Sequence, residues 1–203
     1  LNYIESDNNI ETQEEAAYLL ATAFVESEYS LQRWEADYAC GLYGKPYKDK
    51  PCQSALDYYK STSGGKKNYY SLGVDDRGLP FFGRGLIQLT GRENYKVYSD
   101  VLGVDLLKNP ELALEPNNSY KVASHWMRNH HYKGKSTWEW VSENNLTNAR
   151  KAVNGGVRDL DKINKTFEFW KSILKLTSQK KKLSRESKLT VLTLVIAIAS
   201  LYG

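Results

Sequence analysis

The segment from Phe81 to Tyr95 combines residue types that could bind and position a polar ligand. Glycine lets the backbone bend or approach a ligand closely, and amides and hydroxyls can donate and accept hydrogen bonds. Polar and apolar residues alternate between Leu86 and Thr90, which predicts a short extended run with one polar face. We therefore expect this segment to form a wall of a polar cleft. Its polar and glycine positions are Gly83, Arg84, Gly85, Gln88, Thr90, Gly91 and Asn94.

Read together with Glu26 and Glu35, this segment resembles glycoside hydrolase family 19, which contains chitinases and many phage endolysins. Phe82 to Thr90, followed by Asn94-Tyr95, is similar to the family's signature strand. The stretch Ala23-Phe24-Val25-Glu26-Ser27 resembles the end of its acid-bearing helix, and Ala152-Val153-Asn154-Gly155-Gly156 resembles its Asn-Gly-Gly turn. The resemblance covers roughly residues 12 to 175. It implies a mainly α, lysozyme-like α+β fold in which a small β-strand or hairpin element lines the substrate cleft.

Two carboxyl groups are the core of the chemistry that this resemblance implies. Hydrolysis of a glycosidic bond needs an acid that protonates the leaving oxygen and a carboxylate that activates water. Glu26 is the candidate acid, and Glu35, in a more polar stretch beyond the helix, is the candidate base. Glu28 would point to a different helix face, whereas Asp37 would share a face with Glu35 in an extended stretch. The resemblance implies inversion, with the carboxyls ~6.5–9.5 Å apart.

The resemblance also implies roles for residues around these carboxyls. Thr90 would hold the attacking water with the base, although a β-branched strand residue is the alternative interpretation. A turn role for Asn154 is as well supported as a sugar contact. The predicted substrate-binding residues are Gln88, Asn94, Tyr95 and Asn154.

Two basic residues are expected to support the site. Arg84 would hold the strand or a catalytic carboxylate through paired hydrogen bonds. Lys162 stands where the family commonly has an arginine after the Asn-Gly-Gly turn, and lysine lacks the bidentate fork, so Arg158 is an alternative source of that function. We expect no cofactor and no metal, because the three histidines lack a carboxylate or thiol partner at ligand spacing. These histidines are His125, His130 and His131.

Helical patterns dominate the elements that must position these residues. Thr12 and Glu15 form a predicted capping box, and apolar residues then recur at helical spacing to about Tyr29. A turn is expected at Asn109-Pro110, and Asn117 or Asn118 should cap a helix that continues to His130. The further expected helices are Gln53–Tyr59, Asn94–Leu102 ending at Gly103, Thr137–Glu143, Thr147–Val153 and Asp159–Leu174.

The predicted domain organisation is a catalytic domain over residues 1–176 and a basic linker with a hydrophobic segment over 177–203. The apolar run Leu189–Tyr202 is 14 residues long, short of the ~20 that span a bilayer. It is expected to contact a membrane behind a basic cluster, to pack as a terminal helix, or to be a cleaved or disordered tail. No secretory leader is expected in the given residues. Cys40 and Cys52 could form a disulfide or stay as thiols.

Composition and charge narrow the function class. With 41% hydrophobic residues the 203-residue chain can bury one sizeable core, and a net charge of +4 suits an anionic surface. No nucleic-acid-binding motif is present. We expect an endo-acting hydrolase of β-1,4-linked N-acetylated amino sugars, acting on the peptidoglycan of a bacterial wall from a phage virion or the cell envelope. A chitinase, a non-catalytic wall-binding or virion module, and a lytic transglycosylase are the alternatives.

Overall fold

The computed structural model describes residues 2–27, 73–76 and 81–181. Several predictions therefore concern positions outside the described residues, and they stay predictions. They are those on Glu35, Cys40, Cys52, the helix Gln53–Tyr59 and the segment Leu189–Tyr202. Within the described ranges, no helix is both long enough and apolar enough to cross a membrane.

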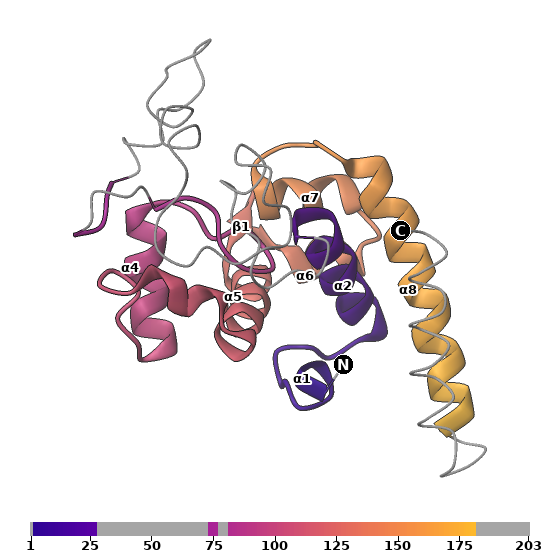
Figure 1. The fold of residues 1–203 in the computed structure, drawn as a ribbon. Coiled ribbons are helices and arrows are strands. Elements are labelled where there is room, and N and C mark those ends of the chain that lie inside the picture. The colour runs from indigo at the N-terminus through magenta and orange to yellow at the C-terminus, as the bar shows by residue number, and fades with distance from the viewer. Residues whose placement is uncertain (1, 28–72, 77–80, 182–203) are drawn as a thin grey trace, which may run out of the picture.

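Two long helices form the centre of the fold. Helix α2 (Gln13–Ser27) packs lengthwise against α8 (Leu160–Lys181), with the short helix α1 (Asn2–Glu5) near the start of α2 (Figure 1). Helices α5 (Pro116–Asn129) and α6 (Thr137–Ser142) also contact α2, and α7 (Leu146–Asn154) packs against α6 and α8. The shared core is built from side chains that include Tyr18, Leu19, Met127, Trp138, Ile163 and Phe167.

The start of α2 follows the predicted capping box. Thr12 Oγ1 accepts a hydrogen bond from the Glu15 amide at 3.1 Å, and Glu15 Oε2 accepts from the Thr12 amide at 3.1 Å. These reciprocal bonds satisfy amides that a helix N-terminus otherwise leaves unpaired. They fix the first turn of the helix that carries Glu26 at its other end.

A second, smaller cluster of apolar side chains joins α5 to α4 (Arg92–Leu102) and the 3₁₀ helix η4 (Pro110–Leu114). Helix α4 ends as predicted: Gly103 adopts a left-handed φ of 69° and its amide donates to the Ser99 carbonyl. The buried members of this cluster are Phe81, Leu89, Tyr95, Tyr98, Leu106, Ala113 and Val122.

The β structure of the described residues confirms a small hairpin but not its predicted place. Strands β1 (His131–Tyr132) and β2 (Lys135–Ser136) pair antiparallel, with His131 opposite Ser136. Lys133 and Gly134 both have positive φ, as a two-residue turn between twisted strands requires. The segment Phe82–Thr90 was expected to be a strand, and this was wrong. It contains one isolated bridge, between Arg84 and Leu89, around a turn.

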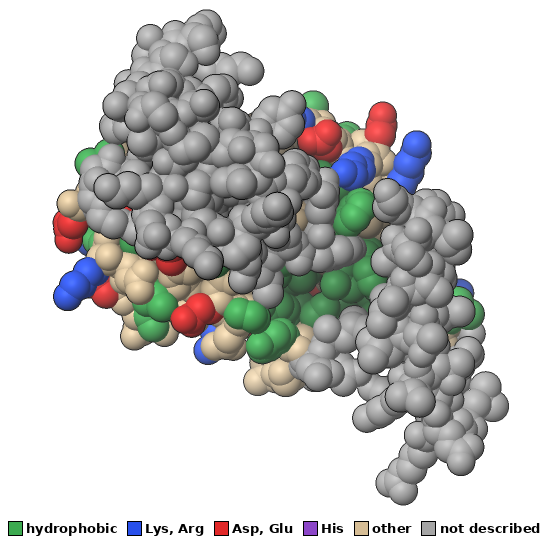
Figure 2. Space-filling model, viewed as in Figure 1, with side chains coloured by type: hydrophobic (Ala, Val, Ile, Leu, Met, Phe, Trp, Pro, Cys, Tyr) green, Lys and Arg blue, Asp and Glu red, His purple; other side chains and the backbone are tan. Residues whose placement is uncertain are grey.

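Helices α5, α6 and α7 match the predicted ones to within two residues, whereas α8 was expected to end at Leu174 and α1 was not predicted; the mainly helical fold class is confirmed. Helix α8 continues to Lys181, past the residue 176 at which the catalytic domain was expected to end. On the visible face, hydrophobic side chains gather around α2, and charged side chains of both signs project near the start of α8 (Figure 2).

Candidate active site

Glu26 lies in the last turn of α2 and is paired with an arginine from a distant part of the chain. Arg150, on α7, donates from Nη1 to Glu26 Oε1. The Arg150 side chain is 2% exposed, whereas that of Glu26 is 19% exposed. Arg150 also donates from Nε to the Arg158 carbonyl at 2.9 Å. The Glu26 carboxyl is therefore fixed by the buried Arg150 guanidinium and remains partly accessible to solvent.

Sequence reasoning did not identify Arg150. It placed the supporting cation after the Asn-Gly-Gly turn, at Lys162 or Arg158. In the structure, the Lys162 ammonium lies 4.9 Å from the ring centroid of Phe24, and Arg158 contributes its backbone carbonyl. Arg150 precedes the turn by one helical turn, in a helix whose neighbouring positions Ala149 and Ala152 are buried. An arginine between small apolar residues was the signal available in the sequence.

Beneath this pair lies a buried phenol. Tyr18, on α2, is fully buried and packs edge-on against Phe167 of α8, with ring centroids 6.0 Å apart. Burial raises the pKa of its hydroxyl; the Arg150 charge opposes this rise, and the Glu26 charge adds to it. The phenol therefore stays neutral, and the apolar floor of the site adds no further charge to the Glu26–Arg150 pair.

The glycine-rich segment forms a tight turn, Arg84–Leu89, which backbone hydrogen bonds close. The Leu89 amide donates to the Arg84 carbonyl at 2.9 Å, and the Arg84 amide donates to the Leu89 carbonyl at 3.2 Å. Gly85 and Gln88 have φ values of 75° and 55°. A Cβ on Gly85 would lie 2.5 Å from Ser119 Oγ, which accepts from the Leu86 amide at 2.8 Å. Glycine thus permits the turn to approach α5.

Three predicted site residues lie together on and after this turn. Gln88 Nε2 donates to the Gly85 carbonyl at 3.0 Å, and Thr90 Oγ1 donates to the Gln88 carbonyl at 2.7 Å. Asn94 Nδ2 donates to the Thr90 carbonyl at 2.7 Å. All three side chains are half-buried. Their donors fix the turn, while the Thr90 hydroxyl oxygen keeps lone pairs that can accept a hydrogen bond.

Tyr95 was expected to contact substrate, but the structure places it in the core. It is fully buried, its hydroxyl donates to the Phe82 carbonyl at 2.9 Å, and its ring packs 5.0 Å from that of Phe81. The reason is its helical position: Tyr95 lies on the inner face of α4, against the second cluster. It supports the turn rather than lining an open surface.

Arg84 holds the same turn, which was one of its two predicted roles. Its Nη1 donates to the Phe82 carbonyl at 3.2 Å and to Tyr95 Oη at 3.0 Å, and its guanidinium lies 4.2 Å from the Phe82 ring centroid. Arg84 Nη2 also forms an ion pair with the Glu111 carboxylate, at 3.5 Å. The arginine that contacts Glu26 is thus Arg150.

Asn154 ends α7 and takes the turn role in this structure. Its side chain is exposed, and its Oδ1 accepts from the Gly156 amide at 2.9 Å. Gly155 follows with a left-handed φ of 74°. Asn154 comes four residues after Arg150, so the two lie on the same face of α7. The exposed amide therefore lies about one helical turn from Arg150, which holds Glu26.

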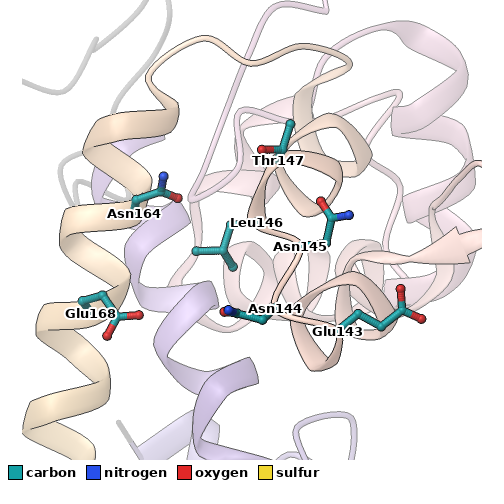
Figure 3. Close-up of a pocket in the computed structure, with 7 residues that line it drawn as sticks. All are labelled: Glu143, Asn144, Asn145, Leu146, Thr147, Asn164 and Glu168. Carbon is teal, nitrogen blue, oxygen red and sulfur yellow. The ribbon is translucent and has the colours of Figure 1, made fainter.

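A depression of about 470 Å³ lies at the opposite end of α7 (Figure 3). Leu146 and Thr147 at the start of α7 face Asn164 and Glu168 of α8 across it. It contains none of the predicted site residues, so we do not assign the reaction to it. Over the described ranges, no group of three or more His, Cys, Asp and Glu side chains is arranged to hold a metal ion.

Comparisons with known proteins relate this chain to chitinases. Acidic endochitinase SP2 of Beta vulgaris is 32% identical over 100 residues, which are 46% of this chain and 32% of that protein. Chitinase 8 of Oryza sativa subsp. japonica is 54% identical over 33 residues, 16% of this chain and 13% of that protein. The alignments thus span about a third or less of the length of these relatives.

Among solved structures, chitinase C from Streptomyces griseus HUT6037 shares the fold, with a TM-score of 0.52 at 22% identity. The superposition covers 80% of this chain and 60% of that one. The family model for chitinase class I matches residues 4–157, which include Glu26, the turn at Arg84–Leu89, Arg150 and the Asn-Gly-Gly turn. The chain therefore belongs to glycoside hydrolase family 19, the chitinase class I family.

Proposed function

We propose that this chain hydrolyses β-1,4-linked polymers of N-acetylated amino sugars by an inverting mechanism with two carboxyl groups. The observation that carries the proposal is the Glu26–Arg150 pair, a partly exposed carboxyl fixed by a buried arginine at the end of a helix. Membership of the chitinase class I family supports the same reaction type. The pair also supplies the contact between an arginine and the candidate acid that Lys162 cannot provide.

In this mechanism Glu26 donates its proton to the glycosidic oxygen as the bond from that oxygen to the anomeric carbon breaks. Glu35 takes a proton from a water molecule, which attacks the anomeric carbon from the opposite face. Arg150 engages Glu26 Oε1, and Oε2 has no hydrogen-bond donor among the described residues. We assign the transferred proton to Oε2, because the arginine then fixes the direction in which the acid points.

Thr90 and the amides complete the proposed mechanism. The Thr90 hydroxyl donates to the Gln88 carbonyl, so its oxygen can accept a hydrogen bond from the attacking water. Gln88, Asn94 and Asn154 would bind the N-acetyl and hydroxyl groups of the sugar, since amides both donate and accept. Substrate binding at Asn154 would compete with its present hydrogen bond from the Gly156 amide.

Two polymers are candidates for the substrate. The named relatives are chitinases, which favours chitin. Two sequence features favour peptidoglycan: the nine-residue spacing of Glu26 and Glu35, and the sequence from Leu89 to Tyr95. Both are typical of the phage and bacterial branch of the family. Action on peptidoglycan would place the protein at the bacterial cell envelope.

Glu26→Gln tests the acid. The amide preserves shape but cannot donate a proton, so reducing-sugar release should fall ~10²–10⁴-fold on the better of two substrates, purified cell walls and colloidal chitin. Glu168→Gln is the matched control, because Glu168 is exposed on α8 and pairs with Lys171 at 3.3 Å. A folded Glu26→Gln protein that keeps more than about one per cent of the activity would show that another group is the acid.

Glu35→Gln tests the base. Because this group acts on water placed for the chemical step, turnover should fall while the Michaelis constant changes little. Full activity without Glu35 would instead favour a lytic transglycosylase, which needs one catalytic carboxyl.

A further inference from the structure

The loop between α7 and α8 places a second arginine beside the candidate acid. Arg158 accepts a hydrogen bond at its carbonyl from Arg150 Nε, at 2.9 Å, and Arg150 in turn holds Glu26. Left-handed residues flank the loop, with φ values of 74° at Gly155 and 58° at Asp159. The backbone of Arg158 is thus fixed two hydrogen bonds away from the Glu26 carboxyl.

The side chain of Arg158 is directed to solvent. The side chain is 90% exposed, and its Nε forms an ion pair at 3.5 Å with Asp159, whose side chain is 48% exposed. An exposed pair at that distance contributes little and exchanges readily with other anions. The guanidinium is therefore available to a ligand, and the backbone that carries it is linked through Arg150 to the Glu26 carboxyl.

The charges around this position are mixed. Asp159, Asp161 and Lys162 are also exposed, and Figure 2 shows side chains of both signs near the start of α8. The Lys162 ammonium lies over the Phe24 ring, and the Arg150 charge is matched by Glu26. Local charge therefore nearly balances, so any selectivity of the loop must come from a directed contact by Arg158 rather than from a broad positive field.

We infer that Arg158 recognises a carboxylate of the glycan, which makes the substrate an anionic amino-sugar polymer of the peptidoglycan class. The inference rests on the proposed hydrolysis and names the substrate class for the same site. Arginine binds carboxylates through a planar, bidentate fork. Peptidoglycan strands carry carboxylates on their lactyl groups or peptides, whereas chitin carries no ionised group. The net charge of +4 assists encounter with such a polymer.

The test compares kcat/KM on soluble peptidoglycan strands with kcat/KM on chitin oligosaccharides, for wild type and Arg158→Gln. The substitution keeps the backbone carbonyl that Arg150 uses, so the support of Glu26 is unchanged. We expect about a tenfold loss on peptidoglycan, the size of one charged hydrogen bond, and less than about a twofold change on chitin oligosaccharides.

Two further comparisons isolate the carboxylate contact. Amidation of the peptidoglycan carboxyls should lower wild-type kcat/KM to the level of Arg158→Gln and should leave the variant unaffected. Arg92→Gln removes another exposed arginine, on α4, and should change neither substrate. Equal losses on both substrates, or no loss on peptidoglycan, would overturn the inference.

Failure of the proposed hydrolysis would be recognised separately. If wild type cleaves neither polymer, the function proposed above is wrong, and binding of the same peptidoglycan strands to wild type and Arg158→Gln then decides the inference. Weaker binding by the variant would support carboxylate recognition, and equal binding would overturn it.

Discussion

Arg84 and Arg150 are both fully buried, yet they serve different parts of the molecule. Arg84 is surrounded by a carbonyl, a phenol and an aromatic ring, and its carboxylate partner Glu111 lies at 3.5 Å. Arg150 contacts a carboxylate directly, and that carboxylate, Glu26, is 124 residues away in the chain.

The difference shows that one buried arginine can stabilise the fold while another positions a residue of the candidate site. A buried guanidinium must be paired, because an unpaired one costs several kcal/mol. Around Arg84 the partners are Phe82, just before the turn, Tyr95 on α4 and Glu111 on η4, so the turn is held against the elements around it. The partner of Arg150 is the partly exposed Glu26 carboxyl, so this arginine orients a group that a substrate can reach.

Arg84→Met should have the largest effect, on stability. It removes the Arg84 donors to the Phe82 carbonyl and the Tyr95 hydroxyl, and it removes the positive charge beside Glu111. We expect a loss of about 3 kcal/mol in the free energy of unfolding, measured by urea denaturation. The activity of the remaining folded protein should fall less than that of Arg150→Met. The reverse order would erase the distinction between the two arginines.

Arg150→Met should act mainly on catalysis. Glu26 would lose its orientation, and misplacement of a reacting group by ~1 Å can cost about 10²-fold in turnover. Stability should fall less than for Arg84→Met, because the freed Glu26 carboxyl can turn toward water. Arg150→Lys should restore part of the turnover, since it keeps the charge but not the fork that also reaches the Arg158 carbonyl. If Arg150→Lys had the same turnover as Arg150→Met, the loss would come from side-chain packing rather than from the charge.

Gly85→Ala tests whether the Arg84 turn depends on its backbone as well as on its arginine. At φ 75°, an added Cβ would meet Ser119 Oγ at 2.5 Å and the Ala113 carbonyl oxygen at 2.9 Å. We expect a stability loss of about 2 kcal/mol or more. Gly103→Ala is the control, because it has a similar φ of 69° with nothing within 4 Å, and should cost only about 1 kcal/mol. Equal stability losses in the two variants would mean that the backbone at residue 85 moves away from α5 at no cost in free energy.

The smallest effect concerns a carboxylate that is held without an arginine. Burial alone would raise the pKa of Asp7, but hydrogen bonds from Ser124, Tyr120 and the Asn9 amide groups lower it below its ordinary value. A lowered pKa adds stability above the unfolded value, about 3.9, and this contribution is lost as pH falls through the folded value. The melting-temperature difference between wild type and Asp7→Asn should therefore be constant above about pH 5 and shrink below about pH 4. A difference independent of pH would contradict the assignment.

Local patterns in the sequence were sufficient for most of the described fold. The capping box at Thr12, the end of α4 at Gly103 and the helices on either side of Asn154 all depend on neighbouring residues, and the structure confirms them. The small hairpin at His131–Ser136 was missed in position, because its strands are two residues long and show no alternation.

The errors share a physical cause. Alternation between Leu86 and Thr90 resembles a strand, but left-handed backbone at Gly85 and Gln88 bends the segment, and a two-residue period cannot reveal this. The contact of Arg150 with Glu26 joins helices that are far apart in sequence, so no spacing rule could predict it. The burial of Tyr95 likewise follows from the packing of α4 against the second cluster. The roles of Glu35, Thr90 and the amides stay predictions.

The turn between Arg84 and Leu89 limits which sequence changes this region can accept. Its closing hydrogen bonds, two left-handed residues and the contact with Ser119 fix the number of residues in the loop. Half-buried Leu86 and Ile87, between these anchors, can be exchanged for other apolar residues. An insertion or deletion, by contrast, would break both pairings at once and swing Gln88 and Thr90 away together. We therefore expect diversity here to arise by replacement at constant length, which makes the loop a suitable place for saturation libraries and a poor one for grafted peptides.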